Sequence, residues 1–165
     1  MPLRQTIRIF TKIGIPVHAL PVVGLLMSTI EIQQILDTRL FYSSNEAIQY
    51  FAQMTMLHSK LYLHHELLDL VYLCVYSILF FNLFEILFPL NKKLLFLAFL
   101  PGVFDLLETS SILYVLRGGS VSRVSAWLGT STLLKWITGT ALLLTYIGRI
   151  IFLMKQALHR KKSFI

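Results

Sequence analysis

The sequence predicts an all-α fold: an integral membrane four-helix bundle with a protruding outer helical hairpin between spans one and two. Of the 165 residues, 56% are hydrophobic and 14% are charged, whereas about a quarter of a typical soluble domain is charged. The mean hydropathy is +0.70. The apolar residues form long blocks, and a helix needs roughly 20 of them to cross a bilayer core. These observations favour a helical, polytopic membrane protein.

Four blocks are long enough, and they predict spans at about 14–30, 68–90, 94–116 and 126–154, all within one transmembrane domain covering residues 1–165. Pro16 and Pro21 predict a kinked or late-starting first helix. No small-x-small cleavage site follows the basic N-terminal residues, so we expect the first span to be uncleaved. A tight turn at Asn91 predicts that spans two and three are antiparallel neighbours.

The connection between spans one and two is predicted to be helical over about 31–67. No glycine or proline occurs from Leu25 to Phe88, so the first helix could continue beyond the membrane. Ser43 and Glu46 have the spacing of a capping box, which starts a helix. From there a helix is predicted to run directly into span two.

The basic residues predict the orientation, because positive side chains are enriched in cytoplasmic loops. One side has four of them and the other has nine. The four are Arg39, Lys60, Arg117 and Arg123, and the nine are Arg4, Arg8, Lys12, Lys92, Lys93, Lys155, Arg160, Lys161 and Lys162. Both termini are therefore expected in the cytoplasm, in a bacterial inner (plasma) membrane. Since this charge lies beside the spans, the net charge of +7 does not indicate nucleic-acid binding.

Two acids and one lysine lie inside the predicted spans. Asp105 and Glu108 are three residues apart in span three, so they share a helical face. Lys135 lies about nine residues into span four, roughly 14 Å deep by helical rise, which matches the depth of the acids. Each unpaired charge would cost about 2.5–3.5 kcal/mol there. We therefore expect an Asp105–Lys135 or Glu108–Lys135 pair, with Thr109 and Thr138 in the same buried polar cluster.

A second charge pair is predicted nearer the cytoplasmic side. Arg149 in span four matches the depth of Glu85 in span two, and Asn82 lies one turn before Glu85. Both predicted clusters have a structural interpretation as well as a functional one. Buried charges can hold helices in register, or they can take part in proton or solute movement.

Histidines gather near the outer end of span two, where His64, His65 and Asp69 are weak candidates for metal ligands. His65 and Asp69 are four residues apart, as two ligands on one helical face would be. Adjacent histidines point in different directions, however, and polar residues at a headgroup boundary are the favoured interpretation of the pattern. Cys74 is the only cysteine, so no intramolecular disulfide forms. No cofactor is predicted.

The stretches "FDLLETSSILYVL" and "TSTLLKW" resemble small four-span bacterial membrane proteins. These have D-x-x-E in the third span, often followed by Asn, and a lysine before an aromatic in the fourth. The resemblance covers mainly residues 95–150 and includes Asp105, Glu108, Lys135 and Trp136. Thr109 stands where Asn is usual. The group has no established activity, so the resemblance implies only that the three ionisable residues act together.

Three functions are compatible with the sequence. The first is a non-enzymatic membrane protein whose polar interior moves protons or a small solute. The second is a structural or accessory membrane subunit, in which the buried charges only lock helix packing. The third is a membrane-embedded enzyme acting on lipid, although no catalytic motif is present and an enzyme is the less favoured expectation. Membrane lipid is the expected partner, and a homo-oligomer or another membrane protein is compatible with so thin a bundle.

Overall fold

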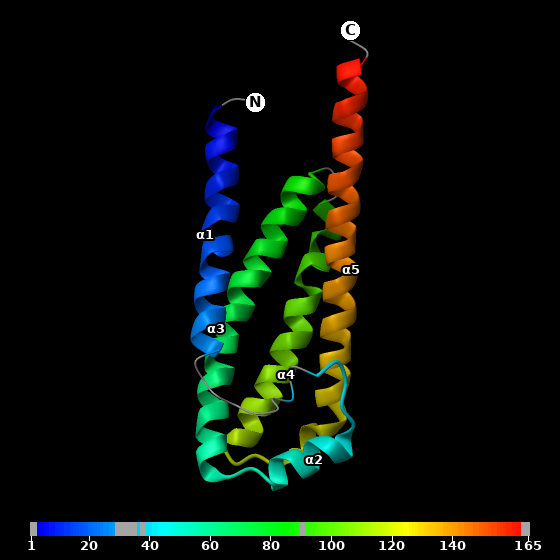
Figure 1. Cartoon of the computed structure of the whole chain (residues 1–165). Helices are drawn as coiled ribbons and strands as arrows, with labels where there is room; N and C mark the ends of the chain where they lie inside the picture. Colours follow the sequence, from blue (N-terminus) through cyan, green and yellow to red (C-terminus); the bar gives the residue numbers. More distant parts are fainter. Residues whose placement is uncertain (1–2, 29–35, 37–38, 90–91, 163–165) are drawn as a thin grey trace.

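The computed structural model describes residues 3–28, 36, 39–89 and 92–162. Within these residues the chain is helical and has no β-strand. Four helices are long and apolar enough to cross a membrane, which confirms the predicted number of candidate spans. Both termini lie at one end of the molecule, and the short helix α2 lies at the other (Figure 1). We call these the terminal end and the distal end.

The first helix, α1 (Leu3–Ser28), starts earlier than predicted and contains both Pro16 and Pro21. The expectation of a late start is therefore wrong. In an apolar medium a helix is the conformation that satisfies most backbone groups within one segment, and neighbouring groups compensate for the bond that each proline removes. Helix α1 packs mainly against α3.

The predicted outer extension differs from the structure where it can be compared. Residues 31–35, 37 and 38 lie outside the described residues. Helix α2 (Ser44–Ala52) has the predicted capping box, with Ser43 at its N-cap and Glu46 at the third position. The expected continuous helix into span two is wrong, because α2 ends at Ala52 and α3 (Met56–Leu87) starts separately with Thr55 as its N-cap.

Helix α2 does not continue the direction of α3. It lies across the distal end and packs against α5 (Figure 1). The apolar side of this short helix contributes Ala47, which is fully buried. Threonine is favoured at helix N-caps, so Thr55 is a signal in the sequence that a separate helix begins there.

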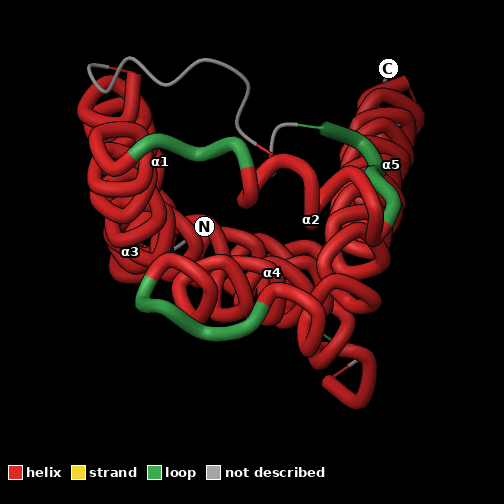
Figure 2. The backbone as a smooth tube through the Cα atoms, turned by 90° about the horizontal axis from the view of Figure 1, so that it is seen from below, coloured by secondary structure: helices red, strands yellow, loops and turns green. Residues whose placement is uncertain are grey.

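The remaining helices are α4 (Leu100–Leu116), preceded by the 3₁₀ helix η2 (Lys92–Phe99), and α5 (Val121–Lys162). The third predicted span is thus divided near Pro101, which occupies the first turn of α4, where proline is well tolerated. The predicted turn at Asn91 lies outside the described residues. Helix α4 packs on both α3 and α5. Viewed from the distal end, the helices form a curved row with α1 and α5 toward its two ends (Figure 2).

Two apolar clusters fill the interior. One, near the distal end, includes Tyr62, Ile112 and Leu128, and the other, nearer the terminal end, includes Ala98 and Leu142. Ala98 of η2 and Ile112 of α4 are fourteen residues apart, as are Leu128 and Leu142 of α5, an interval of about four helical turns. Asp105, Glu108 and Lys135 lie in the interval between the two clusters.

Candidate functional site: a buried carboxyl–lysine cluster

Lys135 lies between the two acids of α4, and we call these three residues the central triad. The Lys135 Nζ atom is 2.9 Å from Asp105 Oδ1 and 2.7 Å from Glu108 Oε2. Asp105 is 5% exposed and Glu108 is fully buried. The three-residue spacing on α4 turns both carboxylates toward α5. The structure therefore brings together the three ionisable residues whose predicted depths in spans three and four match.

The remaining carboxylate oxygens of the triad accept hydrogen bonds from other elements. Tyr76 of α3 donates its hydroxyl to Asp105 Oδ2 at 2.6 Å. Tyr42, just before α2, donates to Glu108 Oε1 at 3.1 Å. Thr132 of α5 donates to the same Glu108 oxygen and lies one turn before Lys135. Every carboxylate oxygen of Asp105 and Glu108 consequently has a partner.

Further buried acids continue this polar region toward the distal end. Thr109 donates its hydroxyl to Asp69 Oδ2 of α3 at 3.0 Å. One helical turn before Asp69, Glu66 is fully buried, and the adjacent His65 is 6% exposed. The His65 Nδ1 atom is 3.9 Å from Glu66 Oε1. Buried ionisable groups thus extend along α3 and α4 from the distal end to the triad.

Thr138, which was predicted to belong to the cluster, bonds within its own helix. Its hydroxyl donates to the Leu134 carbonyl at 2.6 Å and to the Lys135 carbonyl at 3.2 Å. Because these acceptors are backbone groups of α5, the Thr138 hydroxyl is satisfied within its own helix and has no described hydrogen bond to a carboxylate. Thr109 is placed as expected beside the acids, but its partner is Asp69.

The predicted Glu85–Arg149 pair is wrong. Glu85 forms an ion pair with Lys12 of α1, and Asn82 donates to the Lys12 carbonyl at 2.8 Å. Arg149 instead donates from Nε to the Leu87 carbonyl at 3.0 Å. Its guanidinium also lies over the ring of Phe88, 5.6 Å from the centroid. Matching depth did not identify the partner, because Glu85 lies on the side of α3 that packs against α1.

The weak metal candidates are not assembled into a site. Among the described residues, no group of three or more histidine, cysteine or carboxylate side chains is placed to hold a metal ion. The exposed His64 ring is hydrogen-bonded to the Lys60 carbonyl at 2.8 Å, one turn earlier on α3. His65 and Asp69 are buried, and Asp69 accepts the Thr109 hydrogen bond. Because adjacent residues on a helix point in different directions, His64 is exposed and His65 is buried, as expected.

The segment before α2 has no regular secondary structure and contacts the triad through Tyr42. We call its residues 39–43 the strap. Trp136 of α5 donates from Nε1 to the Arg39 carbonyl at 3.1 Å. Ser44 donates from Oγ to the Ser125 carbonyl at 3.1 Å. Between these contacts the Tyr42 carbonyl lies so close to Gly129 that a side chain there would clash with it.

The sequence analysis missed Tyr42, Tyr76 and Thr132 as members of the site. A hydroxyl inside an apolar segment is common in membrane helices and is usually satisfied by the preceding turn. Thr132 does this as well, donating to the Leu128 carbonyl at 2.9 Å. Its spacing of three residues from Lys135 was the one available signal. The role of Tyr42 had no local signal, since it depends on the course of the strap.

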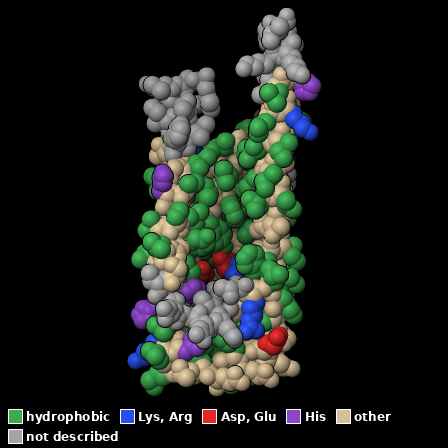
Figure 3. All heavy atoms as spheres, in the orientation of Figure 1, with side chains coloured by type: hydrophobic (Ala, Val, Ile, Leu, Met, Phe, Trp, Pro, Cys, Tyr) green, Lys and Arg blue, Asp and Glu red, His purple; other side chains and the backbone are tan. Residues whose placement is uncertain are grey.

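One face of the molecule is hollowed. Figure 3 shows this hollow between α1 and α5, with hydrophobic side chains over most of its floor and acidic and basic atoms at its distal end. The Lys135 side chain remains 16% exposed. The polar cluster is therefore not fully enclosed by protein.

Comparison with known proteins gave no match to a protein-family model, to a curated protein or to a solved structure. The resemblance inferred from the D-x-x-E and lysine–aromatic patterns stays a prediction.

Proposed function

We propose that the chain is an integral membrane protein whose buried carboxyl groups bind and release protons, so that it moves protons alone or together with a small solute. Four apolar helices of sufficient length support membrane insertion. The excess of Lys and Arg on the side of the two termini supports a cytoplasmic location for both, in a bacterial plasma membrane.

The excess of buried acids carries this proposal. Four carboxyl groups, those of Glu66, Asp69, Asp105 and Glu108, are less than 10% exposed. Lys135 is the cation that contacts the two acids of the triad.

When Asp105, Glu108 and Lys135 are all charged, the triad carries one excess negative charge in a low-dielectric interior, which is unfavourable. Binding of one proton by an acid of the triad is the least costly compensation. Ionisable residues inside membrane segments commonly form proton relays. The Lys135 side chain is 16% exposed, so the triad is not fully closed off from its surroundings.

Proton flux into vesicles tests this proposal. The protein is reconstituted into lipid vesicles that contain a pH-sensitive dye, and a pH gradient is applied. Asp105→Asn and Lys135→Met are each expected to lower the initial flux at least tenfold, because each removes one titrating partner of the triad. Glu85→Gln is the matched control, since Glu85 pairs with Lys12 outside the triad and its loss should leave the flux unchanged.

Flotation of the vesicles shows whether each variant inserts. Wild-type flux in both inserted variants, or no flux above empty vesicles in the wild type across solute conditions, would rule out the proton-linked function.

A structural role is the second candidate, and it is favoured because every carboxylate oxygen of the triad has either a hydrogen-bond or an ion-pair partner. Each oxygen of Asp105 and Glu108 has a partner on α3, on α5 or in the strap. In this case the charges hold the helices of an accessory subunit in register. Asp105→Lys and Lys135→Asp should each reduce the folded fraction, and the double exchange should restore it. Two stably folded single variants would contradict this role.

A further inference from the structure

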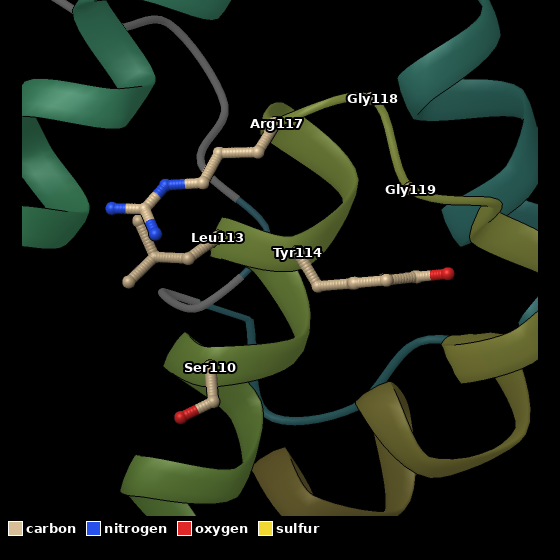
Figure 4. A pocket seen from close by; sticks show the side chains of 6 residues that line it. All are labelled: Ser110, Leu113, Tyr114, Arg117, Gly118 and Gly119. Atoms are coloured by element: carbon tan, nitrogen blue, oxygen red, sulfur yellow. The ribbon is translucent and has the colours of Figure 1, made fainter.

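A pocket of about 480 Å³ lies at the distal end of α4, on a part of that helix that does not take part in the triad. It is lined by Ser110, Leu113, Tyr114, Arg117, Gly118 and Gly119 (Figure 4). The figure shows Ser110, Leu113 and Arg117 extending to one side of the helix and Tyr114 to the other. Arg117 ends α4, so the pocket lies where the apolar segment Leu95–Leu116 stops.

The turn that closes the pocket requires its two glycines. Gly118 has a φ of +92°, in the left-handed region that glycine adopts most easily. A side chain at Gly119 would collide with the ring of Tyr114. The N–H groups of Gly118 and Gly119 donate to the carbonyls of Val115 and Tyr114. The last carbonyls of the helix are thereby occupied, which reduces their repulsion of an anion in the pocket.

Arg117 supplies the charge of this pocket. Its side chain is exposed, and no ion pair joins it to another residue in the described part of the chain. The guanidinium has five N–H donors in a planar arrangement that matches phosphate oxygens. An exposed arginine at the end of an apolar helix would lie at the level of the lipid headgroups.

The exposed face of α4 changes character toward Arg117. Val103 and Leu106 are 48% and 46% exposed, and Ser110 and Arg117 follow on the same face at helical spacing. We call these four residues the α4 stripe. It is apolar at one end and cationic at the other, with one hydroxyl between them. Asp105 and Glu108 lie on the opposite, buried face.

From this arrangement we propose that the pocket and the α4 stripe bind one phospholipid of the distal leaflet. The phosphate group contacts Arg117, the glycerol ester region lies near the Ser110 hydroxyl, and one acyl chain lies along Leu106 and Val103. The lipid complements both the charge of the pocket and the apolar stripe that leads to it. The inference depends on membrane insertion as proposed above, but it does not depend on proton movement.

Native mass spectrometry of the full chain in mild detergent tests the site, with phosphatidylglycerol of 16-carbon chains as the probe. Arg117→Gln should weaken the binding of the first lipid about tenfold, which corresponds to about 1.4 kcal/mol. Arg123→Gln is the matched control. Arg123 is also exposed and lies near the same end, in the first turn of α5, but it does not line the pocket. It should bind the lipid as the wild type does.

Two further measurements separate the sources of phosphate. Lipid with six-carbon chains should bind more weakly than the 16-carbon lipid, because less of the α4 stripe is covered. Inorganic phosphate at millimolar concentration should not displace the long-chain lipid. Equal loss of binding in both arginine variants, no dependence on chain length, or displacement by inorganic phosphate would each overturn the proposal. Dimers that form through this face and exclude the lipid would also overturn it, and would identify a second copy of the chain as the occupant.

Discussion

The hydroxyl groups around the triad link residues that are far apart in the sequence. Glu108 Oε1 accepts from Tyr42 and from Thr132, and both donors are buried. A carboxylate in a membrane interior cannot replace such a donor with bulk water. The stability of the triad therefore depends on neutral residues that sequence reasoning did not select.

Thr132→Val tests this dependence, because valine keeps the shape of the side chain and removes only the hydroxyl. We expect the free energy of unfolding in detergent to fall by about 1 kcal/mol, a magnitude typical of one hydrogen bond. Thr130→Val is the control, since the exposed Thr130 hydroxyl bonds only to the Ala126 carbonyl of its own helix. Equal stability losses in the two variants, measured by thermal or denaturant unfolding, would contradict the specific role of Thr132.

Matching residues by their depth in the predicted spans identified Lys135 as the partner of Asp105. It did not identify Lys12 as the partner of Glu85. Helical rise gives the level of a residue in the membrane, and α4 and α5 are joined by so short a turn that they must be neighbours. Depth does not say which helix faces a given side of α3. Glu85 faces α1, and this contact with Lys12 could be predicted only with the rotation of α3 known. Residues at one depth can pair only when their helices also adjoin.

At the scale of elements, the strap packs against the distal part of α5 and joins it to α2. Its backbone passes Gly129 at a distance that leaves no room for a methyl group. The course of this segment could not be predicted from its sequence, which lacks a regular period and was expected to be helical. The capping box at Ser43 was predictable because its signal is local.

Gly129→Ala tests the close approach of the strap. The new methyl group would meet the Tyr42 carbonyl, so we expect a loss of about 1–3 kcal/mol of stability, the usual effect of overpacking. Gly148→Ala on the same helix has open space around it and should be neutral or stabilising by up to about 1 kcal/mol. Urea or thermal unfolding of both variants gives the comparison. A stable Gly129→Ala protein would show that the strap lies elsewhere.

The capping box of α2 predicts a pH dependence at the distal end. Hydrogen bonds from the Ser43 backbone and side chain hold the pKa of Glu46 below its ordinary value of 4.5. A lowered folded-state pKa stabilises the helix at pH values above 4.5, and this contribution is lost as the pH falls through the folded-state pKa. The protection of the α2 amides, measured by hydrogen exchange relative to the intrinsic exchange rate at each pH, should therefore fall under acid conditions. In Glu46→Gln this loss of protection should be absent, and persistence of the same pH profile would contradict the assignment.

At the scale of the whole molecule, both chain ends lie at the terminal end, in agreement with an even number of crossings (Figure 1). The number and approximate position of the apolar helices were predictable because each is specified by a long local block. The curved arrangement of the helices was not, since it depends on which faces pack together.

Cysteine labelling tests the predicted orientation. In a Cys74→Ser background, Ser122→Cys at the distal end should react with a membrane-impermeant thiol reagent in intact cells. His159→Cys at the terminal end should react only after the membrane is opened, because the excess of basic residues is expected to keep that end in the cytoplasm. Both positions are exposed in the structure. The reverse labelling pattern would contradict the predicted orientation.

The placement of Lys135 against Asp105 and Glu108 also has a consequence for biosynthesis. Helices α4 and α5 carry opposite charges at one depth and are separated only by residues 117–120. Either helix alone would present its ionisable side chains to lipid tails. We therefore expect the two to leave the insertion machinery as one hairpin, with the ion pairs already formed. A chain stopped after Leu116 should be retained by that machinery, whereas a chain extended past Arg149 should be released into the bilayer.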